Sequence, residues 1–106
     1  MSQKEPRIVT RNTSSPVFGR PEWYDWSIYL EGDQDTLNSI QDVTYYLHPT
    51  FPNPIRTVSN PKDGFRLSTR GWGEFEIKIM IKFKNGQTQT LYHWLALAGP
   101  TPLDKQ

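Results

Sequence analysis

The sequence has no cysteine, only two histidines and no long apolar run among its 106 residues. Without cysteine, it can form no disulfide framework, thiolate nucleophile or cysteine zinc site. No segment approaches the roughly 18 apolar residues that a membrane helix needs. The polar first 16 residues resemble neither a secretory signal nor a membrane anchor. We therefore expect a soluble, intracellular protein.

Strong charge of one sign is also missing. The formal net charge is +1, charged residues make up 22% of the chain, and no long run of like charges occurs. Proteins that bind nucleic acid usually present a strongly basic face. We therefore expect no direct contact with nucleic acid or a membrane. The length predicts one domain with a modest core, either a monomer or a weak oligomer.

Catalytic and metal-binding patterns are absent as well. His48 and His93 fall on different predicted strands, and neither has a carboxylate at metal-ligand spacing; a structural zinc needs about four ligands. No serine lies in a nucleophile elbow, and no glycine-rich loop leads into a helix. His93 alternates with Leu91 and Leu95, which favours a half-buried, hydrogen-bonded strand residue. We expect no enzyme, no metal and no cofactor.

Aromatic residues and alternating strands are what the chain does have. Aromatics make up 13%, including four tryptophans, and they suit either a small core or a binding surface. Residues 74–84 alternate with a period of two, which predicts a strand with one buried face. Asn85-Gly86 then predicts a type I′ hairpin, with residues 88–97 as the return strand.

Shorter patterns add more strands. They are a strand over 24–32 that buries Trp26, another over 41–49, a weaker early one near Arg7 and a short one over 64–69, with a helical turn over 35–40. Six to eight short strands indicate an all-β, immunoglobulin-like antiparallel β-sandwich. We expect a polar N-terminal arm, partly an early strand, over 1–20, the sandwich domain over 21–100 and a tail over 101–106.

Two loops stand out beside these strands. HPTFPNPIR, residues 48–56, contains three prolines that stiffen it and remove backbone donors. In GWGEF, residues 71–75, glycine on each side of Trp72 lets the backbone turn or lets another chain approach. Taken singly, Phe51 and Trp72 could simply plug one end of the core. Together, the two loops favour a binding site built on strand ends.

These two motifs, in this order and about fifteen residues apart, resemble the YEATS domain family, and the stand-alone or bacterial type in particular. The resemblance covers about Trp26 to Phe83. It implies an immunoglobulin-like sandwich that reads acylated lysine, acetyl or crotonyl, on histone tails. Phe51 and Trp72 would sandwich the flat acyl amide. Thr50 would supply a hydroxyl, and Trp72 its backbone N–H.

The same resemblance implies further roles. His48 would line the pocket and orient Thr50 or the peptide, and Gly71 and Gly73 would let the ligand backbone pass. Phe75 would close the pocket floor, although its place in the alternating face fits core packing equally well. The partner would be an acylated lysine peptide or protein, a histone tail if the organism is eukaryotic. The location would be nuclear in that case and cytoplasmic in a bacterium.

The sequence also departs from the family pattern. Tyr24-Asp25-Trp26 replaces the usual His-x-Trp, Glu31-Gly32 replaces Arg-Gly, and Glu22 or Trp23 lies nearest to the place of a further pocket aromatic. These departures keep an alternative open. The chain could be a non-catalytic interaction module of a bacterial signalling or defence system, with a ligand that is not a histone.

Overall fold

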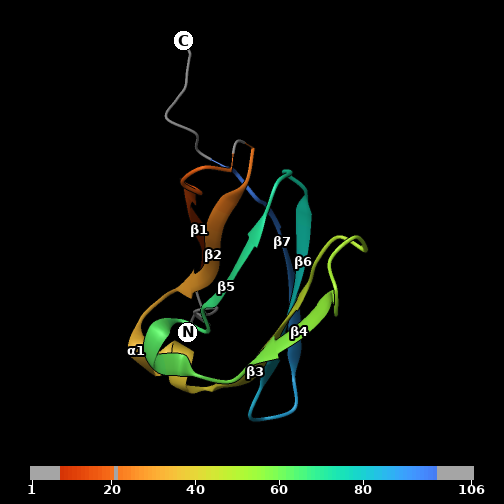
Figure 1. Ribbon diagram of the computed structural model, residues 1–106. Helices are drawn as coiled ribbons and strands as arrows, with labels where there is room; N and C mark the ends of the chain where they lie inside the picture. Colours follow the sequence, from red (N-terminus) through yellow and green to blue (C-terminus); the bar gives the residue numbers. More distant parts are fainter. Residues whose placement is uncertain (1–7, 21, 98–106) are drawn as a thin grey trace.

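Two antiparallel β-sheets pack face to face in the computed structural model, which describes residues 8–20 and 22–97 (Figure 1). The first sheet has the order β1 (Val9–Pro16), β2 (Tyr24–Glu31), β5 (Leu67–Gly71). The second has the order β4 (Ile55–Val58), β3 (Ile40–Tyr46), β6 (Glu76–Phe83), β7 (Thr88–Trp94). The connections hold a short helix α1 (Gln34–Asn38) and a 3-10 turn η1 (Pro61–Asp63). This confirms the predicted immunoglobulin-like β-sandwich.

The core lies between the sheets and follows the alternation of the sequence. One face of each central strand is buried, as the period of two requires. The fully buried side chains include Ile28 of β2, Val43 and Tyr45 of β3, and Ile77, Ile79 and Ile81 of β6. In the described part of the chain no helix is long and apolar enough to cross a membrane.

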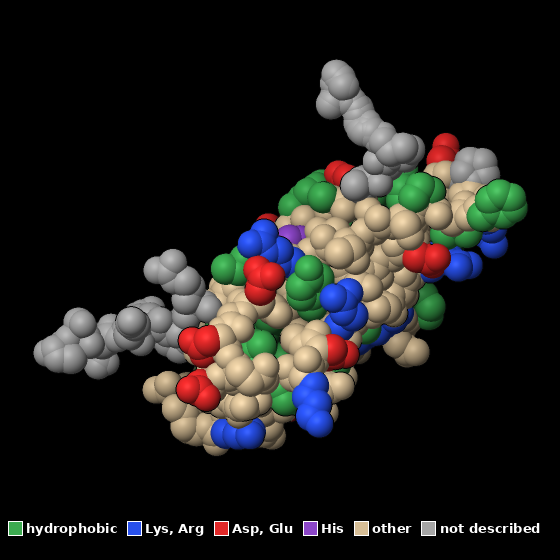
Figure 2. Space-filling model, turned by 90° about the vertical axis from the view of Figure 1, so that its left-hand side faces the viewer, with side chains coloured by type: hydrophobic (Ala, Val, Ile, Leu, Met, Phe, Trp, Pro, Cys, Tyr) green, Lys and Arg blue, Asp and Glu red, His purple; other side chains and the backbone are tan. Residues whose placement is uncertain are grey.

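The outer face of the first sheet is polar. Figure 2 looks onto this side and shows scattered charged side chains on a mainly uncharged polar surface. Ser27 and Ser68 are joined by a hydrogen bond of 2.7 Å between their hydroxyls, and Arg11 pairs with Glu31 at 2.8 Å. One wet face and one buried face are usual for antiparallel sheets.

The strands differ from the predictions mainly at their ends. The early strand is longer and lies further along the chain than expected, since β1 covers Val9–Pro16; Arg7 lies outside the described residues. The predicted strand over 64–69 begins only at Leu67, because Gly64 and Phe65 have φ of 72° and 58°. Strand β4 was not predicted, because prolines surround it in the sequence.

The β6–β7 hairpin corrects the predicted turn type. Only Gly86 has a positive φ, 92°, whereas a type I′ turn would need one at Asn85 as well. The Asn85 side chain instead accepts a hydrogen bond from the Gln87 N–H at 2.9 Å. Gly86 N–H donates to the Phe83 carbonyl and Phe83 N–H to the Gln87 carbonyl. The connection is therefore a three-residue loop with a left-handed glycine.

At each edge of the sandwich, a side chain from one sheet reaches across to the other sheet. Between β7 and β1, His93 Nε2 lies 2.7 Å from Asn12 Oδ1, and His93 Nδ1 lies 2.9 Å from Thr10 Oγ1. His93 is thus half-buried and hydrogen-bonded, as predicted. Between β4 and β5, Arg56 Nη1 reaches Thr69 Oγ1 at 3.4 Å.

Candidate functional site

The two loops singled out in the sequence meet at one end of the sandwich and enclose a cavity of about 540 Å³. One loop connects β3 to β4, and the other connects β5 to β6 (Figure 1). The cavity is lined by Trp23, His48, Thr50, Phe51, Pro52, Arg70, Gly71, Trp72, Gly73, Glu74 and Phe75. The structure therefore brings together all seven residues expected from the sequence. The volume falls in the range of small-ligand sites.

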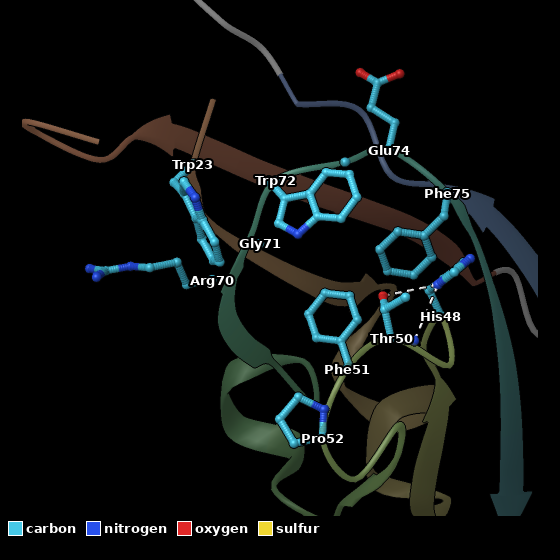
Figure 3. Close-up of a pocket in the computed structure, with 11 residues that line it drawn as sticks. Trp23, His48, Thr50, Phe51, Pro52, Arg70, Gly71, Trp72, Glu74 and Phe75 are labelled. Atoms are coloured by element: carbon cyan, nitrogen blue, oxygen red, sulfur yellow. Dashed lines mark hydrogen bonds between the residues drawn. The ribbon is translucent and has the colours of Figure 1, made fainter. Parts of the chain in front are cut away.

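The β3–β4 loop is folded onto itself. Leu47 N–H donates to the Pro54 carbonyl at 2.7 Å, and Phe51 N–H donates to the His48 carbonyl at 3.0 Å. The prolines between these bonds fix φ and leave few other conformations. The loop therefore presents Thr50 and Phe51 toward the cavity in a fixed arrangement (Figure 3).

His48 determines which way the Thr50 hydroxyl points. His48 Nδ1 lies 3.3 Å from the backbone nitrogen of Thr50, which can only donate, so Nδ1 acts as an acceptor. The Thr50 hydroxyl, at 3.0 Å from the same nitrogen, then donates its proton to Nδ1. We thus assign the imidazole proton to Nε2. The Thr50 oxygen keeps its lone pairs for a donor in the cavity.

Phe51 is a well-supported wall of the cavity. Its ring makes a T-shaped contact with Trp26 at 6.1 Å and a tilted contact with Phe75 at 5.5 Å between ring centroids. Such aromatic pairs stabilise beyond their buried area. Phe75 is buried, and it therefore packs in the core and also lines the cavity.

The two glycines beside Trp72 have different surroundings. A Cβ added to Gly71 would lie 3.0 Å from Phe51 Cζ and 3.3 Å from Trp26 Nε1, so the space at Gly71 is already filled by the protein. A Cβ on Gly73 would meet nothing within 4 Å. Close packing inside the protein thus explains Gly71, and only Gly73 has the open space that a passing ligand would need.

Trp72 itself is the exposed wall. The residue is 62% exposed, although it lines the cavity and lies opposite Phe51 in Figure 3. Trp26 lies below, with its indole nitrogen buried and without a hydrogen-bond partner among the described atoms. A buried indole N–H without a partner is uncommon, and the Trp26 ring makes T-shaped contacts with Phe51 and Phe75.

The charged residues of the cavity already have partners. Arg70 pairs with Asp25 at 2.7 Å, and this hydrogen bond lowers the pKa of the Asp25 carboxyl. Glu74 accepts hydrogen bonds from the Trp94 indole at 3.1 Å and from the Leu97 N–H at 2.9 Å. In Figure 3 the Glu74 carboxylate and the Arg70 guanidinium lie at the margins, and the aromatic rings lie between them. The interior of the cavity therefore suits a neutral, flat group.

Four lining residues were not predicted to belong to the site: Trp23, Pro52, Arg70 and Glu74. The sequence offers Trp23 only as a residue near the place of a further pocket aromatic in the family. The Arg20 guanidinium lies over the Trp23 ring, 4.9 Å from the ring centroid. The other three are direct neighbours of predicted residues, and adjacency in the motif was the only signal for them. Among the described residues no group of three or more His, Cys, Asp or Glu side chains could hold a metal ion.

Comparisons with known proteins agree on one family. The family model described as prokaryotic YEATS domain matches residues 24–96. Transcription initiation factor TFIID subunit 14 of Schizosaccharomyces pombe is 40% identical over 65% of this chain, and protein AF-9 homolog of Saccharomyces cerevisiae is 39% identical over 73%. These matches cover 31% and 37% of the two relatives, so this chain spans about a third of their length.

Solved structures show the same likeness. A structure of the Yaf9 YEATS domain recognising a succinylated histone H3 peptide has a TM-score of 0.67 and 32% identity. A second structure, of the Yaf9 YEATS domain bound to an acetylated histone H3 mark, has a TM-score of 0.66 and 32% identity. Each match covers 92% of this chain and 79% of the other.

Proposed function

Because this chain belongs to the prokaryotic YEATS domain family, we propose that it is a non-catalytic reader that binds acylated lysine side chains in the cavity between Phe51 and Trp72. The observation that carries the proposal is a hydroxyl acceptor, Thr50, at the edge of an aromatic cavity whose charged residues are already paired. The Yaf9 structures with acylated histone peptides support it.

An acylated lysine fits the chemistry of this cavity. Acylation removes the lysine charge and leaves a flat amide. That amide stacks between Phe51 and Trp72, and its N–H donates to the Thr50 oxygen. Its carbonyl accepts from the Trp72 N–H, which makes no backbone hydrogen bond within residues 8–20 and 22–97. Without these partners the buried amide would cost about 1–3 kcal/mol.

A cage for methylated lysine is the nearest competing chemistry, because aromatic faces also attract cations. In a methyl-lysine cage, however, a backbone N–H would face a positive charge and repel it. The Thr50 oxygen would find no N–H on a trimethylated nitrogen. We therefore propose an amide ligand. A crotonyl chain, flat beyond the amide, would stack over more of the rings than an acetyl group.

One calorimetric titration tests this proposal. One lysine peptide is prepared unmodified, acetylated, crotonylated and trimethylated, and each form is titrated into the protein. We expect heat of binding from the two acylated forms only. Trp72→Ala should abolish it while the protein keeps its cooperative unfolding. Tyr92→Ala is the matched control, because Tyr92 is 59% exposed and lies outside the cavity.

A second candidate function rests on strand β7. Tyr92 and Trp94 are large, exposed and on the outer face of the second sheet, where aromatics are typical of protein contacts. Under this alternative the chain is an interaction module of a bacterial signalling or defence system, and its partner carries no acyl mark. Binding of a partner that survives Trp72→Ala but is lost with Tyr92→Ala would favour it over the reader.

A further inference from the structure

Arg56 contacts the Phe51 loop, the Phe51 ring and the neighbouring sheet at once. Its Nε donates to the Asn53 carbonyl and its Nη2 to the Pro52 carbonyl, each at 2.9 Å. Its guanidinium carbon lies 5.9 Å from the centroid of the Phe51 ring. We propose that Arg56 is a positioning residue that holds Phe51 in place as a binding wall; the effect on affinity rests on the proposed function.

The loop needs such a residue because of its own sequence. Pro52 and Pro54 have no N–H groups, so the segment has few donors of its own. Asn53 adopts a φ of 50°, a left-handed conformation that asparagine tolerates better than most residues and that makes the loop turn sharply here. Two carbonyl oxygens of this turn, those of Pro52 and Asn53, accept hydrogen bonds from one planar guanidinium. Arginine suits that task, because its donors lie in a fixed fork.

The bonds to the loop also define where the Phe51 ring can lie. Pro52, whose carbonyl is bound, directly follows Phe51 in the chain. The ring is further enclosed by Trp26, Phe75 and the backbone of Gly71. Figure 3 shows the ring opposite Trp72, across the cavity. Because Arg56 fixes Pro52, the residue after Phe51, it also fixes the distance between the Phe51 ring and Trp72.

A third bond ties this arrangement to the other wall. Arg56 Nη1 reaches Thr69 Oγ1 on β5 at 3.4 Å, which is long for a hydrogen bond. Thr69 precedes Gly71 by two residues on the same strand, and Trp72 directly follows Gly71. Arg56 thus contacts the segments that support both walls, although its two short bonds are to the loop.

The test replaces Arg56 while keeping its charge. In Arg56→Lys, a single ammonium cannot reach both carbonyls in the geometry of the fork. We expect the affinity for the acetylated peptide to fall about fivefold or more, because charge-assisted hydrogen bonds are lost. Arg66→Lys is the matched control, since Arg66 stacks on Tyr29 at 4.2 Å outside the cavity. The affinity of Arg66→Lys for the acetylated peptide should stay within twofold of the affinity of the parent protein.

A second measurement separates positioning from the proposed function. Ring proton shifts of Phe51 are recorded by NMR in the free protein, without any peptide. Arg56→Lys should move them and leave the His93 ring signals unchanged, whereas Thr69→Val should move them less. If the parent protein fails to bind the acylated peptide, the reader function fails, but moved Phe51 shifts still support the positioning role. Unmoved Phe51 shifts in Arg56→Lys would overturn it.

Discussion

The two aromatic walls of the cavity differ in how much of the fold depends on them. Phe51 packs against Trp26 and Phe75, so truncating it would also loosen the core. Trp72 is 62% exposed and supports little besides the cavity. A loss of binding after a change at Trp72 can therefore be read as a loss of ligand contact. At Phe51 the same loss would mix binding with stability.

The glycines on each side of Trp72 give a paired prediction. In Gly71→Ala the new methyl group would meet Phe51 Cζ at 3.0 Å and push the ring. We expect lower stability, by about 1–3 kcal/mol as is usual for overpacking, together with weaker peptide binding. Gly73→Ala should keep full stability, because its Cβ meets nothing within 4 Å. Urea unfolding of both variants would show the difference. Equal loss of stability in the two would contradict this explanation of Gly71.

The Thr50 hydroxyl gives a second prediction for a single side chain. Thr50→Val keeps the shape but leaves the ligand N–H without an acceptor. We expect affinity for the acylated peptide to fall by about 1–3 kcal/mol, roughly 5- to 150-fold. Thr57→Val is the control, since Thr57 bonds Thr44 on the outer sheet face at 3.0 Å. Calorimetric titration measures both, and unchanged binding by Thr50→Val would exclude the hydroxyl from the site.

The link between strands β1 and β7 should make the free energy of unfolding depend on pH. Burial lowers the pKa of His93 below its ordinary value of 6.5. Between the two pKa values the unfolded chain binds more protons than the folded one, so acid favours unfolding. We expect the full free energy of unfolding above about pH 7 and a decrease as pH falls through 6.5 toward the folded pKa.

Urea unfolding at pH 7.5 and pH 5.5 checks this dependence. His93→Gln should flatten it, because the titrating group is gone. A parent protein whose free energy of unfolding is equal at both pH values would rule out the role of His93.

A strand could be predicted from the sequence where the burial of one face produced an alternating pattern of apolar and polar residues. Strands β2, β3 and β6 alternate clearly, because one face of each enters the core. β1 was only partly seen, since it is an edge strand of serine, threonine and asparagine. β4 was hidden by the preceding prolines. Asn85-Gly86 marked the hairpin but not its type, because the Asn85 side chain bonds locally instead of adopting a positive φ.

For the molecule as a whole, the site was more predictable than its supports. Nine of the eleven residues that line the cavity lie in two short motifs, and the resemblance of these motifs to a known family drew attention to seven of them. The contact of Arg56 with Thr69 depends on how the two sheets approach each other. The packing of Phe51 against Gly71 depends on the same approach. No local pattern encodes that distance, so these supports emerge only from the fold.

The size of the cavity predicts the strength of binding. One lysine side chain buries little area, and ordering the peptide costs free energy. We expect a dissociation constant on the order of micromolar or weaker for the single domain. Calorimetric titration measures it directly. Two domains joined by a flexible linker should bind a doubly acylated peptide at least tenfold more tightly through avidity, and an unlinked mixture serves as the control.

The central claim is that Phe51, Thr50 and Trp72 hold an acyl amide. The most direct test is an NMR titration of isotope-labelled protein with one lysine peptide, unmodified or acetylated. The reporters are the Trp72 indole and backbone N–H signals and the Thr50 amide signal, with Tyr92 as a distant reference. We predict saturable shifts at Trp72 and Thr50 with the acetylated peptide alone. Absence of these shifts in a folded protein, or equal shifts with the unmodified peptide, would contradict the claim.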